Sequence, residues 1–230
     1  GVVLWEVMSG GPTVLVTGGA GFIGSHLVDR LLADGWSVVV IDDLSTGSTE
    51  NLRQARGAPQ LRVIQGKVSE TPDLTDLARA ADFIFHLAAA VGVELVVKEP
   101  AHTIRTNLVE TDAILEAAAT ASTPLILAST SEVYGKSAQE RFSESDDLLI
   151  GRPDRIRWGY ACSKLMDEFM AMAVAKERGL PVTIARLFNT VGPRQTGQYG
   201  MALPRFIEAA LSDAPIRVYG DGLQTRTFCY

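Results

Sequence analysis

LVTGGAGFIGSHLVDR, residues 15–30, places a glycine-rich turn between an apolar strand and an amphipathic helix. Gly19, Gly21 and Gly24 have the spacing G-x-G-x-x-G. The first glycine allows a tight turn, the second lets a pyrophosphate approach the backbone, and the third lets the helix pack against the strand. The helix that begins near Phe22 directs N–H groups and its positive dipole end toward the phosphates. We predict a dinucleotide site here; the alternative is a turn that serves packing alone.

Strands and helices alternate along the rest of the chain. Apolar strands are predicted at residues 13–16, 36–41, 61–64, 82–87, 124–128 and 181–185, and a short one at 216–219. Helices are predicted at residues 22–34, 51–56, 73–80, 100–119, 158–178 and 203–211, with a polar loop at 135–157. Strands that are apolar throughout are typical of a parallel sheet covered on both faces. The pattern predicts an α/β fold, a Rossmann-type doubly wound parallel sheet with right-handed crossovers.

Three consecutive segments are expected along the chain. Residues 1–12 are interpreted as an N-terminal extension, and residues 13–190 as the dinucleotide-binding domain, which also holds the catalytic residues. Residues 191–230 are interpreted as the beginning of a smaller C-terminal substrate-binding region. The chain stops at DGLQTRTFCY without a closing helix, so we expect this last region to be truncated.

The composition limits the classes of partner. The apolar fraction of 47% suits a soluble globular protein, and a net charge of -6 argues against nucleic acid or an anionic membrane as a partner. Cys162 and Cys229 are too few and too far apart for a disulfide framework, which suits a reducing, cytoplasmic compartment. The three histidines have no metal-ligand spacing, and no segment has the length of a membrane span. We therefore expect no bound metal.

An acidic residue follows the glycine motif at the distance that a dinucleotide site requires. Asp42 lies eighteen residues after Gly24, at the end of the second strand. A carboxylate there accepts hydrogen bonds from the adenosine ribose hydroxyls and repels a 2′-phosphate, so NAD is favoured over NADP. Asp43 follows it, and either aspartate could instead be a solvated turn residue. Residues 87–90 and 129–131, at the carboxyl ends of two strands, should border the cofactor cleft.

Tyr160 and Lys164 are four residues apart in a predicted helix, so they share one face. A free tyrosine has a pKa of about 10, too high for a base at neutral pH. A nearby ammonium and a cationic nicotinamide would both favour the phenolate and lower that pKa. The pair could then remove a hydroxyl proton while a hydride leaves for NAD. The spacing is common by chance, so this interpretation depends on the dinucleotide motif ahead of it.

Three polar residues follow the fifth strand: Thr130, Ser131 and Glu132. A hydroxyl at this place can hydrogen-bond the substrate oxygen that becomes a carbonyl. Glu132 could act as a second acid or base on a neighbouring carbon. The alternative for Glu132 is a loop carboxylate without a chemical role.

Six motifs stand in order along the chain. They are TGGAGFIGSH (17–26), HLAA (86–89), STSEVYG (129–135), YACSK (160–164), RLFNTVGPR (186–194) and VYGDGLQTRTF (218–228). From about residue 13 to its end, the sequence resembles the extended short-chain dehydrogenases/reductases that modify nucleotide sugars, the NAD-dependent epimerase/dehydratase family. The resemblance implies that Tyr160, assisted by Lys164 and by Thr130 or Ser131, oxidises the C4 hydroxyl of a sugar. NAD would stay bound and return its hydride later in the same cycle.

The resemblance also implies a set of binding residues. Cofactor-binding positions would be Gly18, Gly21, Phe22, Ile23, Gly24, Asp42, Asp43, Gly47, Val68, Leu87, Asn107, Tyr160 and Lys164. Asn189 would meet the substrate diphosphate, and Arg226 would pair with it through charge-assisted bonds, unless these are a loop cap and a solvated arginine. One departure is Lys67, because relatives often carry an aspartate there, near the adenine amino group.

Three reactions branch from the same 4-keto intermediate. A 4,6-dehydratase would need an aspartate where Ser131 stands, which argues against dehydration. UDP-glucuronate decarboxylases share the Thr-Ser-Glu sequence, and RWGYACSK is similar to theirs. VGPRQTGQYGM and AAVGV are closer to nucleotide-sugar epimerases. We rank a UDP-sugar 4-epimerase first, the decarboxylase a near second and the dehydratase third; the non-enzymatic alternative is an NAD-binding sensor or scaffold.

The resemblance also implies a homodimer formed through two helices, here residues 100–119 and 158–178. Met166, Met170 and Met172 add apolar side chains to the second of them. These methionines could line such an interface or belong to the core.

Overall fold

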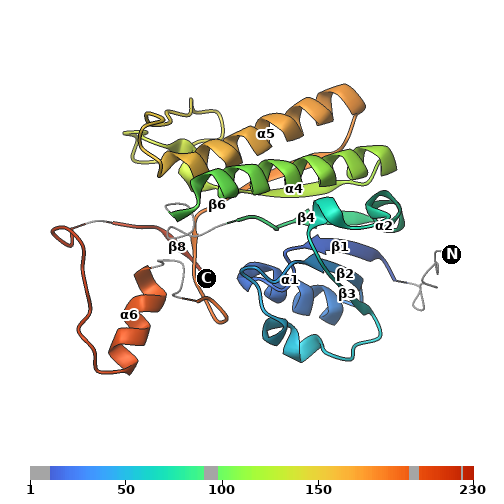
Figure 1. Cartoon of the computed structure of the whole chain (residues 1–230), viewed down its shortest axis with the longest axis horizontal. Coiled ribbons are helices and arrows are strands. Elements are labelled where there is room, and N and C mark those ends of the chain that lie inside the picture. Colours follow the sequence, from blue (N-terminus) through green and yellow to red (C-terminus); the bar gives the residue numbers. More distant parts are fainter. Residues whose placement is uncertain (1–10, 91–97, 197–201, 224) are drawn as a thin grey trace. The chain divides into compact units, whose positions relative to one another are not determined.

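The computed structural model of the protein describes residues 11–90, 98–196, 202–223 and 225–230 (Figure 1). Some features of the sequence lie outside the described residues. They are residues 1–10 of the predicted N-terminal extension, residues 91–93 of AAVGV, residues 197–201 of VGPRQTGQYGM, and Gln224.

The strands and helices follow the predicted order. The strands are β1 (Thr13–Thr17), β2 (Ser37–Asp42), β3 (Leu61–Gln65), β4 (Phe83–His86), β5 (Leu125–Thr130), β6 (Val182–Leu187), β7 (Asn189–Thr190) and β8 (Phe228–Cys229). The α-helices are α1 (Phe22–Ala33), α2 (Leu74–Ala80), α4 (Pro100–Ala121), α5 (Trp158–Arg178) and α6 (Ala202–Leu211). Short 3-10 helices are η1 (Thr49–Ala55), η2 (Val68–Glu70) and η3 (Ser131–Tyr134).

The main sheet has the order β3-β2-β1-β4-β5-β6, and the pairings from β3 to β5 are all parallel. This is the order of a doubly wound Rossmann sheet, so the predicted fold is confirmed. The short strand predicted at residues 216–219 is wrong. Ile216 and Val218 remain 50% and 58% exposed, because no neighbouring strand covers them. The late strand is instead β8, which pairs with β7 in a second, two-stranded sheet.

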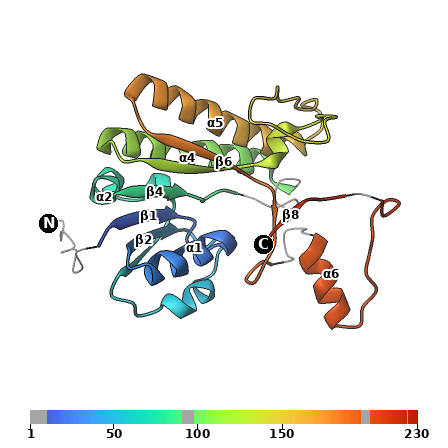
Figure 2. The ribbon, with the colours of Figure 1, turned by 180° about the vertical axis from the view of Figure 1, so that it is seen from behind.

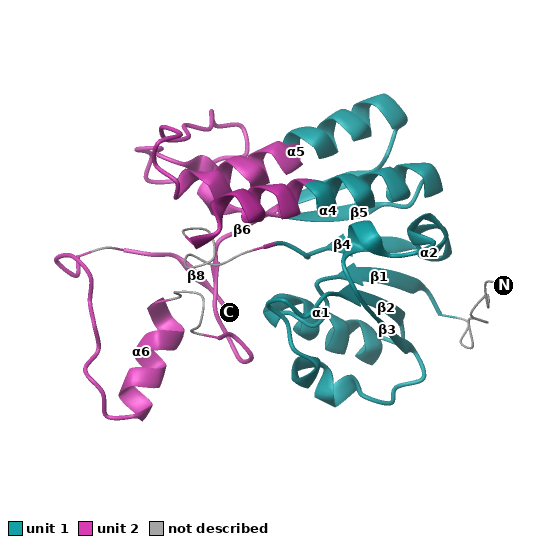
Figure 3. Ribbon diagram, in the orientation of Figure 1, with its two compact units in different colours: residues 1–89, 109–128, 169–184 teal, residues 90–108, 129–168, 185–230 magenta. Residues whose placement is uncertain are grey.

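The chain divides into two compact units (Figure 3). Unit 1 comprises residues 1–89, 109–128 and 169–184, and unit 2 comprises residues 90–108, 129–168 and 185–230. The division falls within α4, β5, α5 and β6. The domain boundaries predicted at residues 12 and 190 stay a prediction.

The core of unit 1 lies on both faces of the sheet, because successive side chains of a strand point to opposite faces. Val14 and Val16 of β1 pack in a cluster with Val28 of α1. Leu15 of the same strand belongs to the other cluster, which contains Ile114 of α4. In unit 1, α1 and η1 therefore cover one face, and α2 with parts of α4 and α5 covers the other (Figures 1 and 2).

No helix in the described part of the chain combines the length and apolarity that crossing a membrane requires.

Candidate active site

The glycine-rich turn of unit 1 joins β1 to α1. Gly18 has a φ of +72°, in the left-handed region that favours glycine, and a Cβ there would lie 2.7 Å from the amide nitrogen of Ala88. A Cβ at Gly24 would lie 2.1 Å from the carbonyl oxygen of Gly18. The Gly21 amide donates to the same oxygen at 3.2 Å and closes the turn. Glycine is therefore required at residues 18 and 24 for steric reasons.

The start of α1 suits an anion. Its N-cap, Gly21, provides no side-chain cap for the first N–H groups, and the first turn carries no acidic side chain. The backbone N–H groups at the start of a helix lack intrahelical partners and attract phosphate. Together with the close-packed glycines, this arrangement fits the pyrophosphate of a dinucleotide. The structure thus places Phe22 and Ile23 where the sequence predicts phosphate-binding backbone.

Asp42, at the end of β2, is 7% exposed and orders the glycine turn directly. Its Oδ2 accepts from the Ala20 amide at 2.8 Å, and its Oδ1 accepts from the Leu44 amide at 2.9 Å. Burial raises the pKa of the Asp42 carboxyl, while the backbone hydrogen bonds oppose this shift. A carboxylate has about four acceptor positions, so these two bonds leave capacity for ribose hydroxyls.

Two neighbours of Asp42 differ in their role. A Cβ at Gly47 would lie 2.9 Å from Asp42 Oδ1, so this glycine keeps space beside the carboxylate. Asp43 is exposed, and its Oδ1 accepts from the Ser45 amide at 2.9 Å within its own turn. The structure therefore brings Asp42 and Gly47 to the glycine turn and leaves the ribose contact of Asp43 a prediction.

Asp42→Asn should weaken NAD binding by about tenfold to a hundredfold, the equivalent of one charge-assisted hydrogen bond of about 1.5–3 kcal/mol. The same change removes the charge that repels a 2′-phosphate, so the ratio of NADP to NAD affinity should rise. Calorimetric titration with both dinucleotides measures the two constants. Asp43→Asn tests the second predicted aspartate in the same way. An NAD affinity that is unchanged in Asp42→Asn would contradict the role of Asp42.

A second connection to the glycine-rich turn, through the carbonyl of Ala20, was not predicted from the sequence. The Ala20 carbonyl accepts from the Ser48 amide at 3.0 Å and from Asn51 Nδ2 at 2.9 Å. Ser48 also caps η1, because its hydroxyl accepts from the Glu50 amide at 3.2 Å. The serine of this polar loop was the available signal, since Ser is a preferred N-cap residue.

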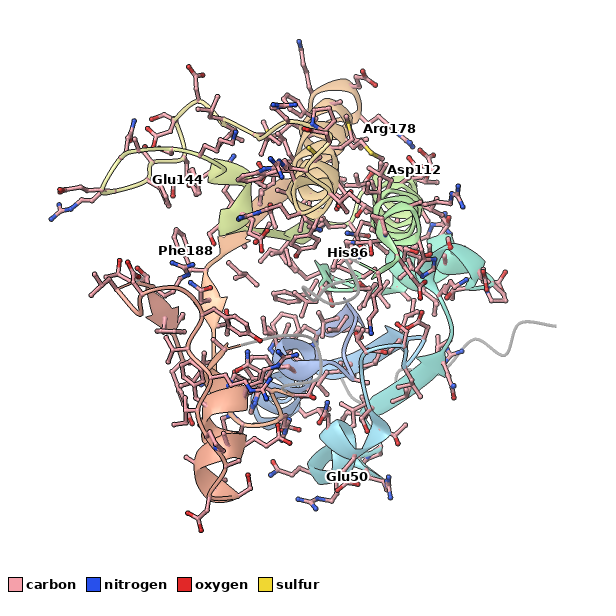
Figure 4. All side chains as sticks on the ribbon, turned by 60° about the vertical axis from the view of Figure 1, so that its left-hand side comes forward. Glu50, His86, Asp112, Glu144, Arg178 and Phe188 are labelled. Carbon is pink, nitrogen blue, oxygen red and sulfur yellow. The ribbon has the colours of Figure 1, made fainter. Side chains whose placement is uncertain are left out.

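Two further predicted cofactor residues of unit 1, Val68 and Leu87, make contacts within that unit. Val68 of η2 is 2% exposed in the core cluster. The Leu87 amide, just after β4, donates to the Thr17 carbonyl at 3.1 Å. Beside it lies buried His86, which is labelled in Figure 4. Its ring nitrogens lie 2.7 Å from the Thr17 hydroxyl and 3.2 Å from the Thr111 hydroxyl. These contacts fix the segment immediately after β4.

Unit 2 gathers the predicted catalytic residues at the end of β5. Thr130 Oγ1 accepts from the Glu132 amide at 3.2 Å and so caps η3. The Thr130 side chain also hydrogen-bonds Tyr160. Ser131 is the first residue of η3. The tyrosine, the two hydroxyl residues and Glu132 therefore lie together, as the sequence predicts.

In this cluster the chain's own groups raise the pKa of Tyr160. Burial is the main cause, and the carboxylates of Glu132 and Asp167 add to it, whereas the bond from Thr130 opposes it. The lowering of this pKa by Lys164 together with a bound nicotinamide stays a prediction. Lys164 Nζ lies 2.8 Å from Asp167 Oδ2, in a buried ion pair that the sequence did not reveal.

Glu132, predicted as a second acid or base, is an exposed residue of η3. Desolvation raises the pKa of its carboxyl, and the charge of Arg157 opposes the shift. The Arg157 guanidinium lies over the Trp158 ring, 4.8 Å from its centroid, which holds it beside the start of α5. A carboxyl group with a raised pKa can donate or accept a proton nearer neutral pH.

Asn107 connects three segments of unit 2. Its Oδ1 accepts from the Ala90 amide at 2.7 Å, and its Nδ2 donates to Ser163 Oγ at 3.0 Å. Ser163 Oγ in turn donates to the Tyr160 carbonyl at 2.9 Å. Asn107 therefore supports the first turn of α5, behind Tyr160, and its contact with a cofactor stays a prediction.

A second charged network also supports η3. Glu168 of α5 accepts from Ser129 Oγ at 2.5 Å and pairs with Arg186 Nη2 at 2.7 Å. The Arg186 guanidinium lies 4.9 Å from the centre of the Tyr134 ring. This network joins β5, η3, α5 and β6.

Of the two residues predicted to bind the diphosphate, Asn189 is the first residue of β7, and Arg226 lies two residues before β8. Asn189 Nδ2 donates to the Thr227 carbonyl at 2.9 Å. Arg226 Nη1 donates to the Thr225 carbonyl at 2.8 Å. The pairing of β7 with β8 brings their segments together, and both side chains are exposed. Their role with a diphosphate stays a prediction.

Residues 14–230 match the model of the family described as "NAD dependent epimerase/dehydratase family". A curated relative, UDP-N-acetyl-alpha-D-glucosaminuronate decarboxylase of Bacillus cytotoxicus, is 42% identical over 217 residues, which are 94% of this chain and 66% of the relative. The chain thus spans less than two thirds of that relative, and about half the length of several other curated relatives.

Two solved structures are similar in both fold and sequence. UDP-N-acetylglucosamine 4-epimerase from Methanobrevibacter ruminantium M1, in complex with UDP-N-acetylmuramic acid, gives a TM-score of 0.88 at 34% identity, over 96% of this chain and 69% of that one. UDP-glucuronic acid 4-epimerase from Bacillus cereus, in complex with UDP-glucuronic acid and NAD, gives a TM-score of 0.85 at 33% identity, over 95% and 69%.

Proposed function

The chain belongs to the NAD-dependent epimerase/dehydratase family, and from this premise we propose that it is part of an enzyme that oxidises C4 of a UDP-linked uronate and releases its carboxyl group as carbon dioxide. The Bacillus cytotoxicus relative, at 42% identity, is named a uronate decarboxylase. Its similarity moves this reaction ahead of the 4-epimerase that the sequence analysis ranked first.

The observation that carries the proposal is the cluster in unit 2. Tyr160 is hydrogen-bonded by Thr130 and has the Glu132 carboxylate as a neighbour, and Lys164 is four residues further along α5. A hydroxyl oxidation needs a group that accepts the proton and a group that bonds the oxygen as it becomes a carbonyl. We assign these two tasks to Tyr160 and Thr130.

NAD fits the residues of unit 1, where the uncapped N–H groups at the start of α1 can receive a pyrophosphate and Asp42 can accept from a ribose. When bound, NAD takes up the hydride from the sugar C4 carbon and later returns it. Asp42 and the start of α1 would hold and orient it.

In the proposed reaction, Tyr160 Oη takes the proton of the C4 hydroxyl, and the hydroxyl of Thr130 or Ser131 bonds the same oxygen. The product is a β-keto acid, which loses carbon dioxide as its C5–C6 bond breaks. The electron pair of that bond is left as an enolate over C5 and C4. Glu132, whose pKa is raised by desolvation, is suited to deliver a proton to C5.

A 4-epimerase is the second candidate, because the Bacillus cereus structure at 33% identity is a UDP-glucuronic acid 4-epimerase. In that reaction the keto sugar keeps its carboxyl group and receives the hydride on its other face. Both candidates act on a UDP-linked uronate and use Tyr160 in the same first step. They differ only in the fate of the keto sugar after the oxidation.

The full-length protein incubated with NAD and UDP-glucuronate, or UDP-N-acetylglucosaminuronate, should release carbon dioxide and form a UDP-pentose, as measured by mass spectrometry and NMR. A product of unchanged mass with an inverted C4 would favour the epimerase instead. Neutral UDP-hexoses serve as control substrates, and they should give no carbon dioxide. Binding of NAD without turnover of any nucleotide sugar would favour the sensor or scaffold alternative.

We also propose that the protein forms a homodimer through α5. Met170 packs against the core of unit 1, whereas Met166 and Met172 are 49% and 59% exposed. Phe169 lies between them in sequence and is 64% exposed. Three large apolar side chains at three-residue spacing form a stripe along one side of the helix. Sedimentation equilibrium of the full-length protein tests this state.

A further inference from the structure

We propose that Asp167 is a positioning residue: its carboxylate fixes the Lys164 ammonium on the buried face of α5, four residues along the helix from Tyr160. The inference rests on the proposed function only in that Tyr160 is taken to be the base.

Helical spacing brings the three residues together. Tyr160, Lys164 and Asp167 are at positions i, i+4 and i+7 of α5, so they lie on one side of the helix. Lys164 Nζ lies 2.8 Å from Asp167 Oδ2. A carboxylate thus fixes the position of an ammonium one turn away from the reacting tyrosine.

Burial distinguishes this pair from others with the same spacing. The Lys164 and Asp167 side chains are 3% and 0% exposed, whereas those of Lys67 and Glu70 are 43% and 68% exposed. An exposed pair contributes little, because water screens it. A buried ammonium that loses its counter-charge is strongly disfavoured. Asp167 therefore provides the counter-charge of the buried Lys164 side chain.

The charge of Asp167 also acts on Tyr160. The groups around the tyrosine are the Thr130 hydroxyl from β5, the Glu132 carboxylate from η3, and Asp167 from its own helix. Glu132 is in turn close to Arg157. The two carboxylates disfavour a negative phenolate, so removal of the Asp167 charge should make the Tyr160 proton easier to remove.

The experiment uses full-length protein labelled with ¹³C at the tyrosine ζ carbons and titrated by NMR, with Tyr160→Phe to identify the Tyr160 signal. In Asp167→Asn, the Tyr160 signal should titrate at a lower pH than in the unchanged protein. Asp167→Glu, which keeps the charge, should titrate close to the unchanged protein. Glu70→Gln, in the exposed pair, is the matched control and should change nothing.

A kinetic arm uses the substrate identified by the product assay. With Asp167→Asn, kcat should fall by about tenfold while the KM for the sugar stays the same, and the acidic limb of the pH profile should move to lower pH. Asp167→Glu should recover most of this loss. Asp167→Ser, which also removes the charge, replaces the asparagine variant if that one does not fold, as judged by circular dichroism.

The inference would be overturned if the Tyr160 signal titrated at the same pH in the unchanged protein and in the folded variant that lacks the Asp167 charge. An activity loss with the same pH midpoint would overturn it too, since that is the result of a structural role alone. The NMR arm needs no turnover. A protein that turns over no nucleotide sugar therefore refutes the proposed function, while the titration still decides the role of Asp167.

Discussion

The Tyr160→Phe variant should convert the nucleotide sugar about 10²–10⁴ times more slowly than the unchanged protein. This factor is the usual contribution of a general acid–base group to the rate. The substitution removes one oxygen atom and its hydrogen bond with Thr130. The aromatic ring stays, so the packing of the first turn of α5 is kept. The rate of product formation, followed by mass spectrometry under saturating substrate and NAD, measures this effect.

Tyr134→Phe is the matched control for this variant. Tyr134 is also buried in unit 2, and its hydroxyl interacts with Arg186 rather than with the catalytic residues. It should lose much less activity than Tyr160→Phe. Both variants should bind NAD as the unchanged protein does. A Tyr160→Phe variant that keeps a tenth or more of the activity would exclude the tyrosine as the base.

Gly24→Ala should be the most damaging single change in the cofactor site. The added Cβ would lie 2.1 Å from the Gly18 carbonyl oxygen, so the turn and α1 must move apart. Overpacking of this kind costs about 1–3 kcal/mol of the free energy of unfolding. Because the displaced atoms belong to the turn that is predicted to bind the pyrophosphate, NAD affinity should fall at least about tenfold. Thermal denaturation and calorimetric titration measure the two effects.

Gly66→Ala provides the comparison for this change. No atom lies within 4 Å of a Cβ built at Gly66, which comes directly after β3. It should leave the free energy of unfolding nearly unchanged. If Gly24→Ala were as stable as Gly66→Ala and bound NAD equally well, the steric argument for the turn would fail.

The sequence predicted most of the fold because its local signals agree with its tertiary packing. The helix predicted at residues 158–178 has the bounds of α5, since apolar residues recur at helical spacing and Gly179 comes next at a φ of +69°. The strand at residues 216–219 failed for the opposite reason. Its apolar residues suggest a strand, and only a partner strand could have stabilised one.

The same difference between local signals and tertiary contacts explains which site residues were predicted. Tyr160, Lys164 and the glycines were found because their spacing is characteristic. Asp167 was missed because a lysine with an acid three residues later is ordinary on helix surfaces, as Lys67 and Glu70 show. Only the fold shows that one such pair is buried and the other exposed. The contact of Asn51 was missed because its partner is a backbone carbonyl, and that of Ser48 because it is made by a backbone amide, which every residue except proline has.

The contacts of Ala20 have a thermodynamic consequence. Its amide is bonded to Asp42, and its carbonyl to the segment that contains Ser48 and Asn51. A ribose that engages Asp42 therefore also stabilises the turn that would receive the pyrophosphate. By thermodynamic linkage, a pyrophosphate bound at the turn must strengthen the binding of the ribose by the same factor. Adenosine and pyrophosphate fragments should thus bind cooperatively, so that the dinucleotide binds more tightly than the affinities of its parts would give.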